Sequence, residues 1–270
     1  MSAGSGGQVA AAIAQVTALS GGDHWFLVLA GRQAGEDWWS RDQAIDALDE
    51  LFAAFPPGAG RSAEAVQGSL RLEAWAWTIR SPATAALLAT GVALDLAAGG
   101  VQVQAPPGQR PVFAAWDLDA PGAQAPRVAD PSDPASIDLL LGPMVAHLAP
   151  LVAAISARTG RSRAALWRGV RDRLAGALLW AGEATGKRGT AELMLHHAVG
   201  HGRVRGPVPR LVGPDGAPAA LGSTPNAPQF GLQTDGAKPE LIRGGCCLWW
   251  RAGHDPCETC PLSHRGGVKH

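Results

Sequence analysis

Hydrophobic residues recur at helical spacing in the first part of the chain. They do so over residues 9–19 and again over residues 44–52, where Ser40 and Gln43 form a capping box ahead of the apolar positions. This pattern predicts a helix over residues 41–55, which the Pro-Pro-Gly run that follows would end.

The next stretch of helical spacing covers residues 62–79 and predicts a second helix. Ser81 followed by Pro82 is typical of an N-cap and a first helical turn. We therefore expect a third helix that begins at this point and is separate from the second.

Short strands are expected between and after these helices. Residues 25–30 form an apolar run that fits either a strand or a buried helix. Residues 101–104 alternate between apolar and polar positions, and the run 111–116 follows after a Pro-Pro-Gly-Gln turn, which predicts a hairpin at the edge of a sheet. Residues 117–135 are rich in Pro, Asp and Gly and indicate a loop or a domain boundary.

The second half of the chain is predominantly helical by the same criterion. Apolar residues recur at helical spacing over residues 144–155, with a kink expected at Pro150. Ser162 precedes a clearer helix with an apolar stripe over residues 166–178, and residues 191–199 predict a shorter helix.

The pattern as a whole predicts a mixed α+β fold with a small antiparallel sheet, a predominantly helical second half and an irregular C-terminal tail. Little regular structure is expected over residues 202–245, apart from a strand at 210–212. We divide the chain into an N-terminal α+β region (1–118), a helical region packed with it as one body (135–242), and a C-terminal segment that contains all four cysteines (243–270).

Charge and composition narrow the class of protein. Lys and Arg together number 23, as do Asp and Glu, so the chain has no net field for nucleic acid or an anionic membrane. No secretory signal is visible, and no run reaches the ~18 apolar residues of a membrane span, residues 83–101 coming nearest. We expect a cytoplasmic protein with no transmembrane segment and no nucleic-acid partner, in which thiols are reduced.

All four cysteines lie within fifteen positions near the C-terminus: Cys246, Cys247, Cys257 and Cys260. The Cys-x-x-Cys pair can place two thiolates on one tight turn, whereas the side chains of the adjacent pair diverge. Two irons that each take two protein sulfurs suit this set better than one zinc ion, whose ligands usually come as two Cys-x-x-Cys-like pairs. A zinc site remains the main alternative, and disulfides or free thiols a further one.

The segment Arg243–Arg251 (RGGCCLWWR), followed by Cys257–Leu262 (CETCPL), resembles the C-terminal motif of the FhuF-like ferric siderophore reductases. That motif is an adjacent cysteine pair, a spacer of about ten residues, and Cys-x-x-Cys followed by Pro-Leu. The flanking positions also match at Arg243, Trp249, Trp250 and Arg251, and residues 164–167 resemble the mid-chain region of the family more weakly. The spacer here has nine residues, one fewer than in the family.

The resemblance implies that Cys246, Cys247, Cys257 and Cys260 ligate one 2Fe–2S cluster. It also implies an oxidoreductase that reduces the Fe(III) of a ferric siderophore by one electron and releases Fe(II). Relatedness to siderophore-synthetase palm-type domains follows as well, which agrees with an α+β fold. Electron transfer needs no acid or base, so no catalytic residue is expected beyond the cluster, and the siderophore-binding residues are not identified.

The chain shows no P-loop and no nicotinamide or flavin fingerprint, so the electrons are expected from an external donor such as a ferredoxin, a flavodoxin or a reductase. The G-x-G-x-x-A match at residues 58–63 follows a helix rather than a strand and is rejected. The alternative function is a non-enzymatic 2Fe–2S electron carrier or redox sensor.

Two further groups of polar residues have an ordinary structural explanation. His196, His197 and His201 could bind a metal, but histidines are also favoured at the C-terminus of a helix, and we prefer that interpretation. The arginines over residues 158–173 could hold an anionic complex, but we prefer the solvated face of a helix.

Overall fold

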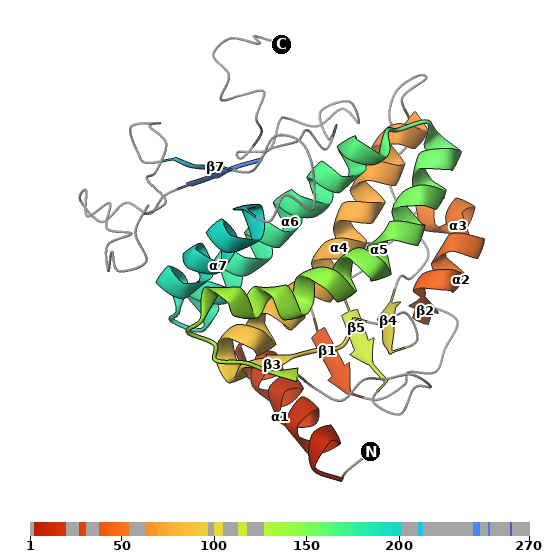
Figure 1. Ribbon diagram of the computed structural model, residues 1–270. Helices are drawn as coiled ribbons and strands as arrows, with labels where there is room; N and C mark the ends of the chain where they lie inside the picture. Colours follow the sequence, from red (N-terminus) through yellow and green to blue (C-terminus); the bar gives the residue numbers. More distant parts are fainter. Residues whose placement is uncertain are drawn as a thin grey trace.

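The computed structural model is a group of long helices packed against a small sheet, with the N-terminal helix at one end (Figure 1). Within the described residues the fold is mixed α+β and mainly helical, as the hydrophobic pattern predicts. The residues that the structure describes are 3–19, 27–30, 38–53, 63–96, 100–104, 113–117, 127–200, 210–212, 240–243, 248 and 260.

Helix α4 (Ala63–Thr90) runs through the middle of the molecule. Helices α5 (Asp138–Thr159) and α6 (Arg163–Ala184) pack along it, α1 (Ala3–Leu19) packs against it as well, and α7 (Arg188–Gly200) packs on α6. Nearly every side chain of α4 from its second turn onward is buried. A helix that is enclosed on all sides belongs at the centre of a fold, and α4 takes that place.

Helix α4 is continuous through Pro82, so the expectation of two separate helices is wrong. A proline inside a helix removes one backbone hydrogen bond and costs about 3 kcal/mol. Here the side chains on both sides of the proline are buried, among them Ile79, Ala83 and Leu87. Their burial offsets the cost, because each large apolar side chain removed from water contributes about 1.5–3 kcal/mol.

The capping box at Ser40 is confirmed, but the helix expected over residues 41–55 is two helices. The Ser40 side chain accepts a hydrogen bond from the Gln43 amide, and the Gln43 side chain accepts one from the Ser40 amide. Helix α2 (Arg41–Asp46) then ends at Ala47, whose backbone leaves the helical region (φ −111°, ψ 39°), and α3 (Leu48–Ala53) follows directly.

The main sheet has the strand order β1-β5-β4-β2. The hairpin of β4 (Val101–Gln104) and β5 (Phe113–Trp116) is confirmed, and the ambiguous run near residue 27 is strand β1 (Leu27–Ala30). The expectation that the hairpin lies at the sheet edge is wrong, because β1 pairs with β5 and β2 (Trp38–Ser40) pairs with β4. The pairing of β1 with β5 is parallel, and the other two pairings are antiparallel.

Two smaller strand pairs complete the described strands. Strand β3 (Val92–Ala93) pairs antiparallel with β6 (Arg127–Val128), which lies in the stretch expected to be a loop. A short 3-10 turn (Pro134–Ile137) leads from there into α5. Strand β7 (Arg210–Val212), predicted from the sequence, pairs antiparallel with β8 (Glu240–Ile242) next to the C-terminal segment.

One described helix, Pro134–Thr159, is long and apolar enough to cross a membrane by length and composition, and 44% of its most apolar window is buried inside the fold. The sequence-based expectation placed the nearest approach to a membrane span at residues 83–101 instead. Its inward face belongs to the hydrophobic core, and a buried core helix passes the same test of length and composition. Inward-facing residues of α5 are Leu140, Leu141, Met144, His147, Leu148, Leu151, Val152 and Ile155.

One hydrophobic core joins buried residues of α1, the sheet and helices α4 to α7. The apolar stripe predicted on α6 is buried in it: Leu166, Val170, Leu174 and Leu178. Residues on both sides of the stretch 117–135 contribute to this core. The division of the chain into regions at that stretch and at residue 243 stays a prediction.

Candidate functional site

The four cysteines predicted to bind a cluster are described at one position only. Cys260 has a free thiol, and its residue is 3% exposed. Cys246, Cys247 and Cys257 lie outside the described residues. So do the neighbouring Trp249, Trp250 and Arg251. The cluster ligands therefore stay a prediction. The contacts of Arg243 show how the start of the segment is attached to the helical body.

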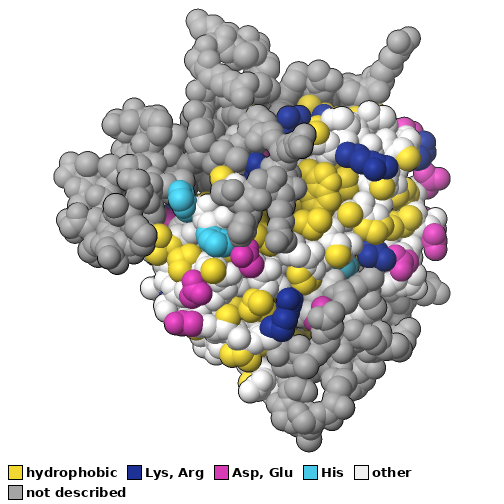
Figure 2. Space-filling model, in the orientation of Figure 1, with side chains coloured by type: hydrophobic (Ala, Val, Ile, Leu, Met, Phe, Trp, Pro, Cys, Tyr) yellow, Lys and Arg dark blue, Asp and Glu magenta, His cyan; other side chains and the backbone are white. Residues whose placement is uncertain are grey.

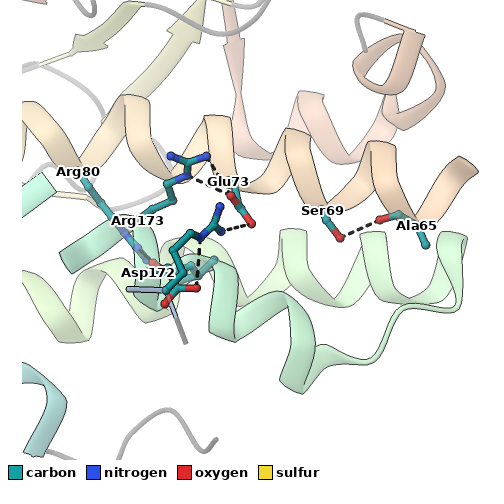
Figure 3. A network of polar contacts seen from close by, with 8 residues as sticks. Ala65, Ser69, Glu73, Arg80, Asp172 and Arg173 are labelled. Atoms are coloured by element: carbon teal, nitrogen blue, oxygen red, sulfur yellow. Dashed lines mark hydrogen bonds and ion pairs between the residues drawn. The ribbon is translucent and has the colours of Figure 1, made fainter. Parts of the chain in front are cut away.

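Arg243, which opens the cysteine motif, is inserted between helices α4 and α6. Its Nη2 atom lies 2.7 Å from Oε1 of Glu73 on α4, and its Nε atom lies 3.5 Å from Oδ2 of Asp172 on α6. The Arg243 side chain is 7% exposed, and those of Glu73 and Asp172 are 3% and 1% exposed. The first residue of the motif is thus anchored by a buried ionic contact to Glu73 and Asp172 of the helical body, both of which are labelled in Figure 3.

A second arginine completes this network from inside the body. Nη2 of Arg173, the residue after Asp172 on α6, lies 3.0 Å from the other carboxylate oxygen of Glu73, Oε2. Glu73 therefore accepts hydrogen bonds from two guanidiniums. One belongs to Arg173 of the helical body, labelled in Figure 3, and the other to Arg243 of the C-terminal segment. Two carboxylates and two guanidiniums balance in charge, which is the condition for keeping ions buried.

A glycine on α6 makes room for this network. A Cβ atom added at Gly169 would lie 2.7 Å from Oε1 of Glu73, closer than real side-chain contacts. Because Glu73 is held by two arginines, it has little freedom to move away. Any residue larger than glycine at this position would therefore press on the carboxylate that binds Arg243.

The electrostatics of Glu73 favour the charged form despite its burial. Burial alone would raise the pKa of this carboxyl. The charges of Arg243 and Arg173 and their hydrogen bonds lower it by more than burial raises it, so the pKa of Glu73 lies below its ordinary value. Removing one member of a buried ion pair typically costs about 3–5 kcal/mol. The contact between the segment and the body is therefore stable across the neutral range.

Leu248, directly after the cysteine pair, makes a second contact with α4. It packs against a small apolar cluster that contains Val66 and Leu70, with Ala74 beside it. Its backbone has φ 67°, a left-handed conformation that costs a non-glycine residue about 1–3 kcal/mol and persists only where the surroundings hold it. Residues on both sides of the cysteine pair are thus anchored to the same helix.

These observations fit a cluster held by the four cysteines. The donor set offers four thiols for two irons, and one thiol, Cys260, is buried and free of any disulfide. The chain enters and leaves the cysteine pair at two fixed points, Arg243 and Leu248. Among the described residues no three His, Cys, Asp or Glu side chains gather as a metal site, and this set includes only Cys260 of the four cysteines.

A second buried polar network lies on a different face of α4. The indole nitrogen of Trp75 donates to Nε2 of His147 on α5 at 3.2 Å, and Nδ1 of His147 lies 2.9 Å from the carbonyl oxygen of Leu96. Burial lowers the pKa of His147 to about 4, with the charge of Arg41 contributing in the same direction. His147 is therefore neutral near pH 7, and its Nδ1–H donates to Leu96.

Two further buried arginines of α4 bind backbone carbonyls. The guanidinium of Arg71 donates to the carbonyl of Leu51, and that of Arg80 donates to the carbonyl of Val170. Burial lowers the pKa of Arg80 to about 9, and its Nε and Nη2 atoms have no hydrogen-bond partner among the described residues. The two side chains join α4 to α3 and α6.

The remaining candidates from the sequence have mixed outcomes. Nε2 of His197 lies 3.1 Å from Oδ2 of Asp138, His196 is exposed, and His201 lies outside the described residues. On the arginine-rich stretch, Arg158 is exposed and pairs with acidic residues of α3 and α4, as expected of a solvated face. That expectation is wrong for Arg171, which is buried.

Charged side chains of both signs are scattered over the face of the molecule drawn in Figure 2. Among the described residues of this face they do not gather into one basic or acidic area. The absence of a nucleic-acid partner stays a prediction.

The comparison with protein families finds a match in the helical body and not at the cysteines. Residues 69–198 match the family model described as a ferric iron reductase FhuF-like transporter. The match extends from the early part of α4 into α7, so it includes Glu73, Asp172 and Arg173 but neither Arg243 nor any cysteine. This region of the chain is therefore similar to the FhuF-like ferric iron reductase family, and the resemblance recognised in the cysteine motif is confirmed.

No curated protein matches the chain. The family match and the cysteine motif come from different residues, because the match ends before the motif begins. Two separate parts of the sequence thus point to the same family. The ion pair between Arg243 and Glu73 joins these two parts in space.

Glu73 and Asp172 were not predicted as residues of the site. The local signal was weak, since each is an acidic residue inside a predicted helix with arginines within two positions of it. A charge at such a position is rarely buried without a partner. The partner, however, lies 170 positions away along the chain for Glu73, and no local pattern could identify it.

Proposed function

We propose that this protein is a cytoplasmic ferric siderophore reductase, with Cys246, Cys247, Cys257 and Cys260 holding a 2Fe–2S cluster. The observation that carries the proposal is the insertion of Arg243, the first residue of the cysteine motif, between Glu73 and Asp172 of the FhuF-like region. This contact supports the proposal because it joins the start of the cysteine motif to the region that matches the family.

The proposed reaction is the one-electron reduction of Fe(III) to Fe(II) within a siderophore complex. Siderophore oxygens are hard ligands that prefer the trivalent ion, so reduction loosens the complex and iron leaves as Fe(II). When bound, the cluster would supply single-electron chemistry, and an external protein would supply the electrons. The residues of this chain hold the cysteine segment on α4 and α6 and exclude water from that contact.

The first experiment determines the metal content. Iron and acid-labile sulfide should each be present at about two per chain in the purified protein. A chain that contains zinc, or one iron without sulfide, would contradict the cluster. The full-length protein with Cys257→Ser and Cys260→Ser is the matched control, and it should contain neither iron nor sulfide in these amounts.

The second experiment tests the reaction. The chemically reduced protein is mixed with ferric hydroxamate, catecholate and carboxylate complexes. The release of Fe(II) is followed with a chelator whose complex with Fe(II) absorbs visible light. At least one complex should reoxidise the protein faster than ferric iron in buffer and release Fe(II). If none does, while the cluster is present, the protein is an electron carrier or redox sensor instead.

A further inference from the structure

We propose that Glu73 and Asp172 are positioning residues for the cysteine segment. By holding the guanidinium of Arg243, they set the point on the FhuF-like body from which the Cys246–Cys247 pair begins. The relevance of this contact to iron reduction rests on the function proposed above, but the contact itself can be tested without it.

Covalent connectivity makes the anchor effective over a short range. Only Gly244 and Gly245 separate Arg243 from the cysteine pair, and Leu248 follows the pair directly. Leu248 packs on Val66 and Leu70, which lie seven and three residues before Glu73 on the same helix. With a rise of 1.5 Å per residue, the two anchors are therefore about 5–10 Å apart along α4.

The two anchors are joined by a short stretch of chain. Five peptide units span at most about 17 Å when extended, which limits how far the residues between Arg243 and Leu248 can reach from either anchor. Leu248 alone is a weak anchor, because it is only partly buried and sits in a left-handed backbone conformation. The ionic anchor at Arg243 is the stronger of the two.

The arrangement of charges explains why this anchor is specific. Glu73 keeps Arg173 as a partner when the segment leaves, so the body can stay folded without Arg243. For Arg243, leaving the body means the loss of two buried carboxylates at once, those of Glu73 and Asp172. Weakening Glu73 should therefore release the segment before it unfolds the body.

The test measures the accessibility of Cys260, which is buried in the structure. The metal-free full-length chain is treated with N-ethylmaleimide, and the labelling rate of Cys260 is followed by peptide mass spectrometry. Arg243→Ala and, separately, Glu73→Gln should each raise this rate at least about tenfold, because undocking exposes the thiol. Circular dichroism establishes that each variant keeps its folded body.

Three further variants make the result decisive. The double variant Glu73→Gln with Arg243→Ala should label no faster than Arg243→Ala alone, because both changes break one contact. Arg243→Lys keeps the charge but not the paired geometry of the guanidinium and should give an intermediate rate. Arg158→Ala removes an exposed arginine that pairs with Asp49 and Glu64, and it should leave the rate unchanged.

A second readout uses the iron-loaded chain. Iron loss to a chelator should be at least about tenfold faster in Glu73→Gln than in the unchanged protein, with the visible spectrum of the cluster also shifted. If the chain takes up no iron and sulfide, the proposed function fails, and the labelling rates still decide the positioning proposal. Equal labelling of Cys260 in the unchanged protein and Arg243→Ala, or additive effects in the double variant, would overturn it.

Discussion

Two faces of helix α4 bury polar groups in opposite ways. Glu73 faces α6 and the cysteine segment, where it forms an ionic network with Arg173 and Arg243. Trp75, two residues later, faces α5, where it forms a neutral hydrogen-bonded network with His147. The neutral network joins elements of the body, whereas the ionic network joins the body to the segment that carries the cysteines.

The difference has a physical basis in what each contact must do. A neutral network costs little to bury when each hydrogen bond is made, and it stabilises the interior wherever the parts are always together. A buried ion pair contributes less net stability but is specific, because an incorrect partner leaves a charge unpaired. The ionic face therefore suits a contact that must place a segment in one position.

Removing the metal ligands is expected to have the largest effect on activity. It should also show that the helical body folds independently of the cysteine segment. Cys257→Ser with Cys260→Ser should abolish iron and sulfide binding and all release of Fe(II). The body should still unfold cooperatively, because its core is built from α1, the sheet and α4–α7 without the cysteines. Calorimetry of the variant and of the metal-free unchanged protein should give similar transitions. Loss of the folded body would show instead that the cluster is structural.

As the pH falls, the network of Trp75 and His147 should lose stability before the ionic network of Glu73 does. The pKa of His147 is lowered from 6.5 to about 4 in the folded state, so unfolding takes up a proton between these values. The contribution of neutral His147 to the free energy of unfolding is complete above pH 6.5. It is lost as the pH falls to about 4, which lowers the free energy of unfolding by about 3 kcal/mol.

His147→Gln can keep both hydrogen bonds but cannot titrate, so urea unfolding of this variant should lack that part of the pH dependence. Glu73 responds in a lower window, because its pKa lies below the ordinary value of 4.5. Its contribution is complete above pH 4.5 and is lost as pH falls through the lowered pKa. An equal pH dependence in His147→Gln and the unchanged protein between pH 6.5 and 5 would contradict the assignment.

Crowding the ionic face should have a smaller effect. In Gly169→Ala the new methyl group presses on Oε1 of Glu73, which should cost about 1–3 kcal/mol and speed labelling of Cys260. Gly7→Ala is the matched control in α1, where nothing lies within 4 Å of the added Cβ. It should stabilise the protein by about 0.5–1 kcal/mol through helix propensity. Stabilisation by both changes would mean that Glu73 is not confined by α6.

The smallest effect is expected on the surface. Arg158→Ala removes pairs with Asp49 and Glu64, at 3.0 and 3.1 Å, but these groups are exposed to solvent. Exposed ion pairs contribute little, so the thermal midpoint should scarcely change, and what change there is should shrink further in high salt. A large fall in the midpoint would show that the arginine-rich face has a structural role.

The sequence predicted those features that depend on local pattern. The capping box at Ser40, the β4–β5 hairpin and the apolar stripe of α6 all follow from spacing within a few residues. The passage of α4 through Pro82 could not be predicted, because tertiary burial outweighs a local helix-breaking signal there. The ion pair between Glu73 and Arg243 could not be predicted either, because the two residues are distant in sequence and come into contact only in the folded chain.

If the cysteine segment acts from a position set by Glu73, the Glu73→Gln variant should reduce ferric siderophores slowly even with its cluster in place. The measurement is the rate at which the reduced protein is reoxidised by a ferric siderophore, compared between the unchanged protein and Glu73→Gln at equal iron and sulfide content. We expect a rate at least about tenfold slower in Glu73→Gln, because misplacement of a reacting group lowers the rate even when the group is present. Reoxidation of Glu73→Gln at the unchanged rate would show that Glu73 does not position the segment.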